Sequence, residues 1–205
     1  MDHPLRGVLV DAVRGRFPDP DGSVELMPPW LDGVEGVVAL TGRAYVATAR
    51  SADAVMAWRP HGFGAAVDPR FIAWLAGPDG WCDCLDVLLA ADGTGAGGPP
   101  PQHGDGHRLR HAQLVRSDVE AFGDSRGVIT LGAGVAGLPE IGVEVAAADR
   151  GTGVGRGLIA DARGLVGTGE PVLAAVAPGN AASLRAFLAA GFRPIGSVQL
   201  VRPEG

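Results

Sequence analysis

The sequence predicts a mixed α/β fold of the α+β type, in which short strands and amphipathic helices alternate irregularly. Short runs rich in β-branched and aromatic residues and bounded by turn residues are typical of strands, and 119–122 and 128–131, joined by the turn 123–127, are two such runs. Residues 154–166 instead repeat their apolar side chains at helical spacing. A chain of 205 residues, 46% hydrophobic and 20% charged, can bury the core of one large or two small domains.

Elements of both kinds are expected in the first 91 residues. Asp68-Pro69 is a typical helix start and Gly77-Pro78 a typical stop. All four tryptophans and the only tyrosine lie in this half, and we interpret them as core, with an aromatic-lined acceptor pocket as the alternative. The expected elements are a helix over 5–16, a strand over 24–27, a hairpin of 37–40 with 45–48, a helix between 68 and 77, and a strand over 81–90.

Residues 92–106 are mostly Gly, Pro and Asp, which predicts a flexible linker or a long surface loop. We therefore divide the chain into an N-terminal α/β region of unassigned fold (1–91), this connecting segment, and a second domain (107–205). The first region could be a separate domain, a degenerate second copy of the later fold, or added strands on one sheet.

The most informative stretch is the glycine-rich turn 150–157, which joins a predicted strand over 140–147 to a predicted helix. The first NH groups of a helix have no carbonyl partner, and the helix dipole adds partial positive charge there. Glycine at 151, 153 and 155 allows positive φ and a close approach of the ligand. The stretch therefore predicts an anion-binding site that can hold a phosphate through backbone groups.

This turn resembles the cofactor loop of the GNAT acetyltransferase superfamily. The pattern of that loop is Arg or Gln, two residues, Gly, one residue, and Gly or Ala. Arg150, Gly153 and Gly155 match it.

A second resemblance to the same superfamily covers 176–196, where a strand is followed by an Asn, a short helix and Gly-Phe. Asn180, the sole asparagine of the chain, occupies the family position and should cap the helix, while Gly191 should end it. We expect Leu184, Phe187 and Leu188 to face the core. Together the two resemblances cover roughly residues 118 to 202.

The resemblance implies a mixed, mainly antiparallel sheet flanked by helices, with acetyl-CoA as co-substrate. It places the pyrophosphate on the amides of the glycine turn and the pantetheine along the strand 140–147, which the family splays from the strand 171–177. The implied cofactor-binding residues are Val143, Val145, Arg150, Gly151, Thr152, Gly153, Val154, Gly155, Arg156, Asn180 and Phe187.

The implied activity is N-acetyl transfer to an amine of a small molecule or protein by direct attack on the thioester. Glu140 and Glu144, on one face of the strand, are the base candidates, and solvated edge carboxylates are the alternative for each. Family bases often lie on the opposite face, with Val143 and Val145. Phe187 stands where the family often has a tyrosine acid, so water or another group must protonate the thiolate.

Two alternatives of other classes stay open. One is a non-catalytic acyl-CoA-binding or regulatory module that has lost the acid. The other is a dinucleotide-binding protein using Gly132–Gly137, a G-x-G-x-x-G after a strand. That motif should open a helix, whereas Leu138-Pro139 follows it at once.

Charge and composition limit the partners. A net charge of −6 argues against nucleic acid, which needs a basic face. The chain shows no signal peptide and no membrane-spanning run, so we expect a cytoplasmic protein without membrane contact. The acceptor and homodimerisation are left open.

No metal site is predicted. Cys82 and Cys84 could join His103, His107 and His111 in a zinc site, but that spacing fits no established finger or ribbon. We interpret the two thiols as one buried and one exposed.

Overall fold

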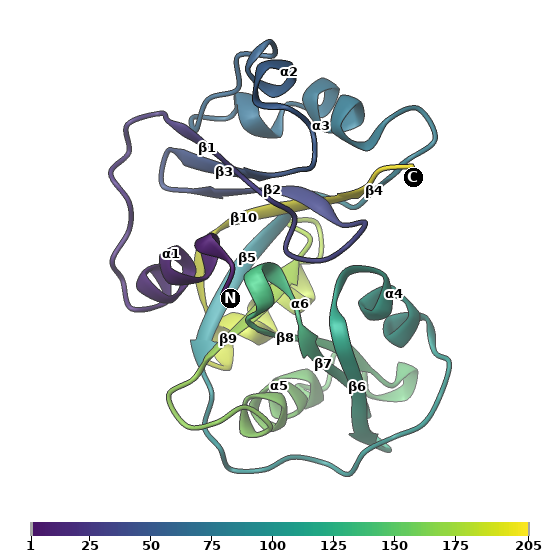
Figure 1. Cartoon of the computed structure of the whole chain (residues 1–205). Helices are drawn as coiled ribbons and strands as arrows, with labels where there is room; N and C mark the ends of the chain where they lie inside the picture. The colour runs from purple at the N-terminus through teal and green to yellow at the C-terminus, as the bar shows by residue number, and fades with distance from the viewer. Residues whose placement is uncertain (1, 205) are drawn as a thin grey trace. The chain divides into compact units, whose positions relative to one another are not determined.

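The computed structural model describes residues 2–204 (Figure 1). Its contacts divide the chain into two compact units. Unit 1 contains the chain up to Val87 and from Ile195 onward, and unit 2 contains Leu88–Pro194. The chain passes from one unit to the other within β5 (Asp86–Asp92) and again within β10 (Arg193–Arg202).

Unit 1 is built on a sheet in the order β1-β3-β2-β10, with the two-residue β4 (Trp81–Cys82) also on β10. The other strands are β1 (Val24–Met27), β2 (Glu35–Leu40) and β3 (Arg43–Ala47). β3 pairs antiparallel with β2 and parallel with β1, and β10 pairs antiparallel with β2. The predicted hairpin is confirmed.

The hairpin is tighter than expected because its turn consists of only Thr41 and Gly42, both at positive φ (48° and 78°). Two consecutive residues at positive φ match the right-handed twist of the flanking strands, as in a type I′ turn.

The helices of unit 1 are α1 (Pro4–Val13), α2 (Ala52–Met56) and α3 (Pro69–Ala76), with a 3-10 turn at Ala65–Val67. α3 begins and ends as predicted: the Asp68 carboxylate accepts the Arg70 NH at 2.8 Å, and Gly77 stops the helix at φ 84°. The helix expected over 5–16 ends earlier, and α2 was not predicted. Buried Phe71 and Leu75 of α3 join Val37 in one core cluster.

Unit 2 contains β6 (Ser117–Asp124), β7 (Gly127–Ala133), β8 (Pro139–Val145) and β9 (Pro171–Val176), in the order β5-β9-β8-β7-β6. β6, β7 and β8 pair antiparallel, and β8 and β9 pair parallel. The predicted fold class, a mixed and mainly antiparallel sheet flanked by helices, is confirmed.

β8 and β9 are paired over a very short length. Their register is limited to Glu140 with Leu173, whereas β7 and β8 stay in register from Gly127–Val145 to Ala133–Pro139. The part of β8 that leads to the glycine turn therefore has a backbone edge that β9 does not cover.

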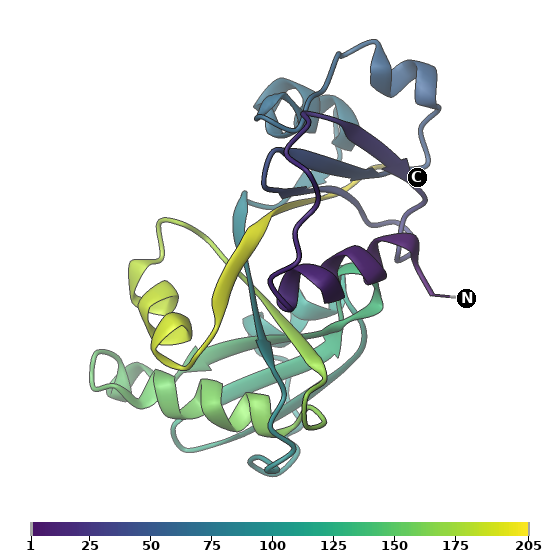
Figure 2. The same ribbon diagram turned by 90° about the vertical axis from the view of Figure 1, so that its left-hand side faces the viewer.

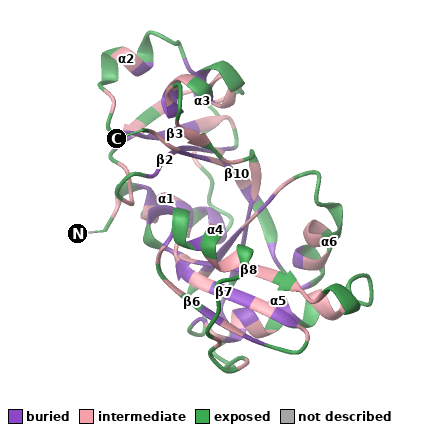
Figure 3. Cartoon of the chain, turned by 90° about the vertical axis from the view of Figure 1, so that its right-hand side faces the viewer, coloured by how far each residue is buried: buried purple, intermediate pink, exposed green. Residues whose placement is uncertain are grey.

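Three helices complete unit 2: α4 (His107–Val115), α5 (Val154–Gly164) and α6 (Ala181–Ala189). α5 extends along the sheet (Figure 2) and buries Leu158, Ile159 and Ala162. β7 has no exposed residue, so both faces of the sheet are covered at its centre (Figure 3). α4 packs on β6, β7 and β8.

The segment predicted over 92–106 is a surface loop of unit 2 from residue 93 onward, because Asp92 still belongs to β5. The NH groups of Gly93, Gly95 and Gly97 donate to carbonyls of residues 164–170, at the end of α5 and just beyond it. The boundaries between the two units lie between Val87 and Leu88 and between Pro194 and Ile195. They do not lie in this loop, where the sequence suggested a boundary.

Two local expectations differ from the structure. The strand expected over 81–90 is interrupted, because β4 ends at Cys82 and β5 begins at Asp86. Leu188, predicted to face the core, is 44% exposed, while Phe187 beside it is buried. Within residues 2–204, no helix has the length and apolar character needed to cross a membrane.

Candidate functional site

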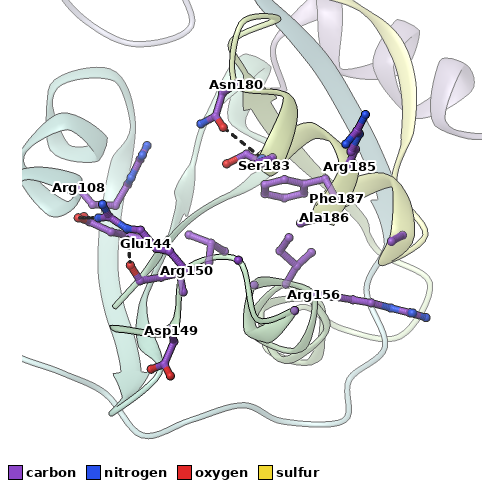
Figure 4. Close-up of a pocket in the computed structure, with 18 of the residues that line it drawn as sticks. Arg108, Glu144, Asp149, Arg150, Arg156, Asn180, Ser183, Arg185, Ala186 and Phe187 are labelled. Carbon is purple, nitrogen blue, oxygen red and sulfur yellow. Dashed lines mark hydrogen bonds and ion pairs between the residues drawn. The ribbon is translucent and has the colours of Figure 1, made fainter. Parts of the chain in front are cut away.

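Unit 2 has a pocket of about 700 Å³ where the glycine turn, β8, α4 and α6 meet (Figure 4). Of the residues predicted to bind a cofactor, all except Thr152 and Val154 line it. The lining residues are His107, Arg108, Val143, Glu144, Val145, Asp149, Arg150, Gly151, Gly153, Gly155, Arg156, Ile159, Asn180, Ala182, Ser183, Arg185, Ala186, Phe187 and Ala189.

The glycine turn has the backbone that the sequence predicted. Gly151 and Gly153 have positive φ (79° and 91°), and a Cβ added at either would meet nothing within 4 Å. Gly153 is the N-cap of α5 and makes no side-chain capping bond. The first amides of α5 are therefore left for a ligand, in open space at the positive end of the helix.

Gly155 serves close packing instead of positive φ. A Cβ there would lie 3.3 Å from Cγ2 of Val145, closer than ordinary van der Waals contact. The missing side chain lets α5 lie directly against the end of β8.

Arg126 links the β6–β7 turn to α5 and to the residue that follows β8. Its guanidinium binds Asp124 at 2.6 Å and Asp161 of α5 at 2.7 Å, and its carbonyl accepts the NH of Ala146 at 2.8 Å. The hydrogen bonds to these two carboxylates raise the pKa of Arg126, and those from Arg126 lower the pKa of Asp124. The β6–β7 turn is thus tied both to α5 and to the segment that enters the glycine turn.

The pocket is positively charged, although the whole chain is negative. Four arginines line it (Arg108, Arg150, Arg156 and Arg185), against two carboxylates, Glu144 and Asp149. A local surplus of positive charge in a concave site attracts anionic ligands.

α6 supplies the opposite wall. The side-chain oxygen of Asn180 accepts the NH of Ser183 at 3.1 Å, so the predicted capping bond is present, and Gly191 lies at φ 89° beyond the helix end. Phe187 is 5% exposed and packs edge-on against Phe192, with ring centroids 5.0 Å apart. Its ring adds an apolar wall without a hydroxyl.

Glu144 is the one exposed residue of β8, and it lines the pocket. Its carboxylate lies 4.0 Å from the Arg150 guanidinium, whose Nε donates to the Val145 carbonyl at 3.4 Å. Val143 and Val145, on the opposite face of the strand, line the pocket as well. Both faces of β8 are therefore represented in the pocket at this end of the strand.

Glu140, the other base candidate, does not line the pocket. It is 3% exposed, pairs with the Arg116 guanidinium at 2.6 Å, and accepts the NH of Val135 at 3.3 Å. Buried carboxylates of this kind are paired because an isolated buried charge is very costly. We therefore correct the expectation of a solvent-accessible Glu140 and assign it a structural ion pair.

The same carboxylate explains the G-x-G-x-x-G sequence. Within Gly132–Gly137, the last three residues form a 3-10 turn (Val135–Gly137), and β8 follows, not a helix. A Cβ on Gly134 would lie 2.0 Å from Oε2 of Glu140, so the loop folds around an anion that belongs to the protein. The dinucleotide alternative thereby loses its structural basis.

The sequence did not predict α4 or its two pocket residues, His107 and Arg108. The glycines before His107 pointed to a loop, and only the packing of α4 against the sheet shows the contribution of these residues. The predicted strands and the glycine turn do not indicate that α4 forms part of the pocket wall.

The histidine and cysteine cluster considered for zinc is divided between the units. Cys82 and Cys84 are both exposed free thiols of unit 1, so the expectation that one of them is buried is wrong. The rings of His107 and His111 stack in unit 2, with their centroids 6.5 Å apart. Across residues 2–204 there is no group of three or more His, Cys, Asp and Glu side chains arranged to hold a metal ion.

Comparisons with protein-family models and with curated proteins give no match. Among solved structures, the chain is similar to an acetyltransferase from Colwellia psychrerythraea, with 11% identity and a TM-score of 0.38 over 60% of this chain and 57% of that one. It is also similar to an acetyltransferase from Novosphingobium aromaticivorans, with 17% identity and a TM-score of 0.32 over 62% of this chain and 69% of that one. Both are described as GNAT-family acetyltransferases. The chain thus spans little more than half the length of the first, 57%.

Proposed function

We propose that this protein transfers an acetyl group from acetyl-CoA to an amine. The observation that carries the proposal is one pocket that combines three features. These are uncapped amides at the start of α5, an apolar strip with Val143, Val145 and Phe187, and a solvent-accessible carboxylate, Glu144. A pyrophosphate, a pantetheine chain and an amine each need one of the three.

In this proposal, acetyl-CoA lies along the pocket from the glycine turn to β8. The pyrophosphate would bind the amides of Gly153–Gly155, with Arg150 and Arg156 nearby to balance its charge. The pantetheine amides would pair with the edge of β8 that β9 leaves uncovered after Glu140. This arrangement uses backbone groups for most of the polar contacts.

The chemistry would be a direct transfer. The neutral amine nitrogen forms a bond to the thioester carbon while the carbon–sulfur bond breaks. We assign polarisation of the carbonyl to the NH of Val145, and removal of one amine proton to Glu144, directly or through a water. Phe187 has no hydroxyl, so water protonates the departing thiolate.

Replacing Glu144 with Gln is expected to lower kcat/KM about a hundredfold at neutral pH, the lower end of what a general base contributes. The affinity for CoA should change less than twofold, and the loss should shrink at high pH because solvent then deprotonates the amine. Thiol release is the measurement, and Glu120→Gln is the matched control, since Glu120 is exposed on β6 outside the pocket. An unchanged pH–rate profile would remove Glu144 from the mechanism.

Phe187 favours one second candidate, a non-catalytic acyl-CoA-binding module. A site without the usual acid can still hold the cofactor, because the glycine turn and β8 do not depend on it. Tight binding of acetyl-CoA without thiol release, across a broad panel of amines, would identify this function instead.

Calorimetric titration tests the shared part of both candidates. Acetyl-CoA and CoA should bind to the purified full chain, and NAD should not. Failure of both CoA species to bind to a folded sample would disprove the proposed function. Cytoplasmic location stays a prediction from the sequence, and homodimerisation stays open.

A further inference from the structure

We propose that the acceptor is a primary amine that carries an acidic group, a carboxylate or a phosphate, and that Arg108 binds this group. The inference rests on the proposed function and specifies its substrate class. Arg108 is the pocket arginine that contacts β8 at Gly142, away from the glycine turn.

Arg108 is half-buried, and its Nε is inaccessible to solvent and has no hydrogen-bond partner within residues 2–204. Arg116, the C-cap of the same helix, also has an unpartnered Nε within these residues, but its charge is balanced by Glu140 at 2.6 Å. A guanidinium stays charged at any physiological pH and offers five donors in a planar fork. No carboxylate pairs with Arg108 within residues 2–204, and the side chain lines the pocket, so the geometry favours an anionic ligand at its guanidinium.

Arg108 lies beside β8 at Gly142. Its Cδ is 3.4 Å from the place that a Cβ of Gly142 would occupy. Alternate residues of a strand share a face, so Glu144 follows Gly142 on that face, about 7 Å further along the strand. Figure 4 shows Arg108 and Glu144 in the same part of the pocket wall.

The cofactor does not account for this charge. In the proposed arrangement its phosphates lie at the glycine turn, where Arg150 and Arg156 line the pocket, and its acyl end beside β8 is uncharged. Gly142 lies three residues before Val145, about 10 Å from the turn end of the strand. An acceptor whose amine reaches Glu144 and whose acidic group reaches Arg108 would span the remaining distance of about 7 Å.

The test compares acetylation of three acceptor sets by the full chain: L-amino acids, O-phosphoethanolamine, and L-amino acid amides as neutral counterparts. Wild-type protein should acetylate at least one acidic acceptor ten or more times faster than its neutral counterpart. Preference for amino acids identifies a carboxylate, and preference for O-phosphoethanolamine identifies a phosphate. Equal rates for acidic and neutral amines would overturn the proposal.

The variant Arg108→Gln should lose at least tenfold in kcat/KM for the acidic acceptor, and with it the preference for that acceptor over its neutral counterpart. Arg108→Lys, which keeps the charge and loses the fork, should fall between the two. Arg110→Gln is the matched control, because Arg110 is exposed on α4 outside the pocket. An unchanged acidic preference in Arg108→Gln, with an unchanged melting temperature, also overturns the proposal.

Titration with CoA separates this inference from the proposed function. Arg108→Gln should bind CoA as wild type does. If wild type binds no CoA species, the proposed function fails, and the Arg108 site is judged by direct titration with the N-acetyl amino acids and their amides. Binding of the acids alone, lost in Arg108→Gln, then supports the site, and equal or absent binding overturns it.

Discussion

Replacing Gly153 with aspartate is expected to weaken CoA binding at least about a hundredfold, or roughly 2.7 kcal/mol, without lowering the melting temperature relative to the asparagine variant. Gly153 caps α5 at φ 91°, and a side chain there points into open space beside the first amides of the helix. A carboxylate in that position repels the pyrophosphate and competes for the same NH groups. Placing like charges together in a binding site costs several kcal/mol.

Gly153→Asn is the control that isolates charge from backbone strain. Asparagine and aspartate have the same shape and tolerate the left-handed region about equally, so both variants carry the same strain. Aspartate at an N-cap also stabilises the helix. Calorimetric titration with CoA and thermal unfolding should therefore separate affinity from stability. Equal CoA affinity in the two variants would show that the turn does not bind the pyrophosphate.

Replacing Arg116 with Met is expected to lower the free energy of unfolding by about 3–5 kcal/mol, the usual effect of removing one partner of a buried ion pair. Arg116 and Glu140 side chains are 6% and 4% exposed and lie 2.6 Å apart. Removal of the guanidinium leaves a carboxylate buried among α4, β7 and β8. Urea unfolding followed by circular dichroism gives the change directly.

Adding Glu140→Gln to Arg116→Met should recover most of that stability, to within about 1–2 kcal/mol of wild type, because no unpaired charge remains and the amide still accepts the Val135 NH. The double variant should also retain acetyl transfer, since Glu140 does not line the pocket. Loss of transfer with normal stability and normal CoA affinity would return Glu140 to the catalytic candidates. Failure of the second substitution to restore stability would contradict the ion-pair assignment.

Features determined by neighbouring residues could be predicted from the sequence by itself. Asp68 and Asn180 cap their helices as predicted, and Gly151 and Gly153 adopt the positive φ that the turn requires. After Gly132–Gly137, the chain continues at Leu138-Pro139 as the strand β8 and not as a helix, as predicted. Each of these depends on backbone sterics and hydrogen bonds within a few residues, so the local sequence contains the necessary information.

Only the tertiary structure decided the features that depend on distant partners. Glu140 and Glu144 share one strand face, yet one meets Arg116 and is buried while the other remains exposed at the pocket. The last strand, β10, continues into unit 1 because its backbone pairs with β2, more than 150 residues earlier in the chain. The pocket wall at Arg108 exists because α4 packs on β8. Periodicity and motifs describe a segment's own backbone and faces, whereas the packing of one segment on another determines which charges are buried, paired or left for a ligand.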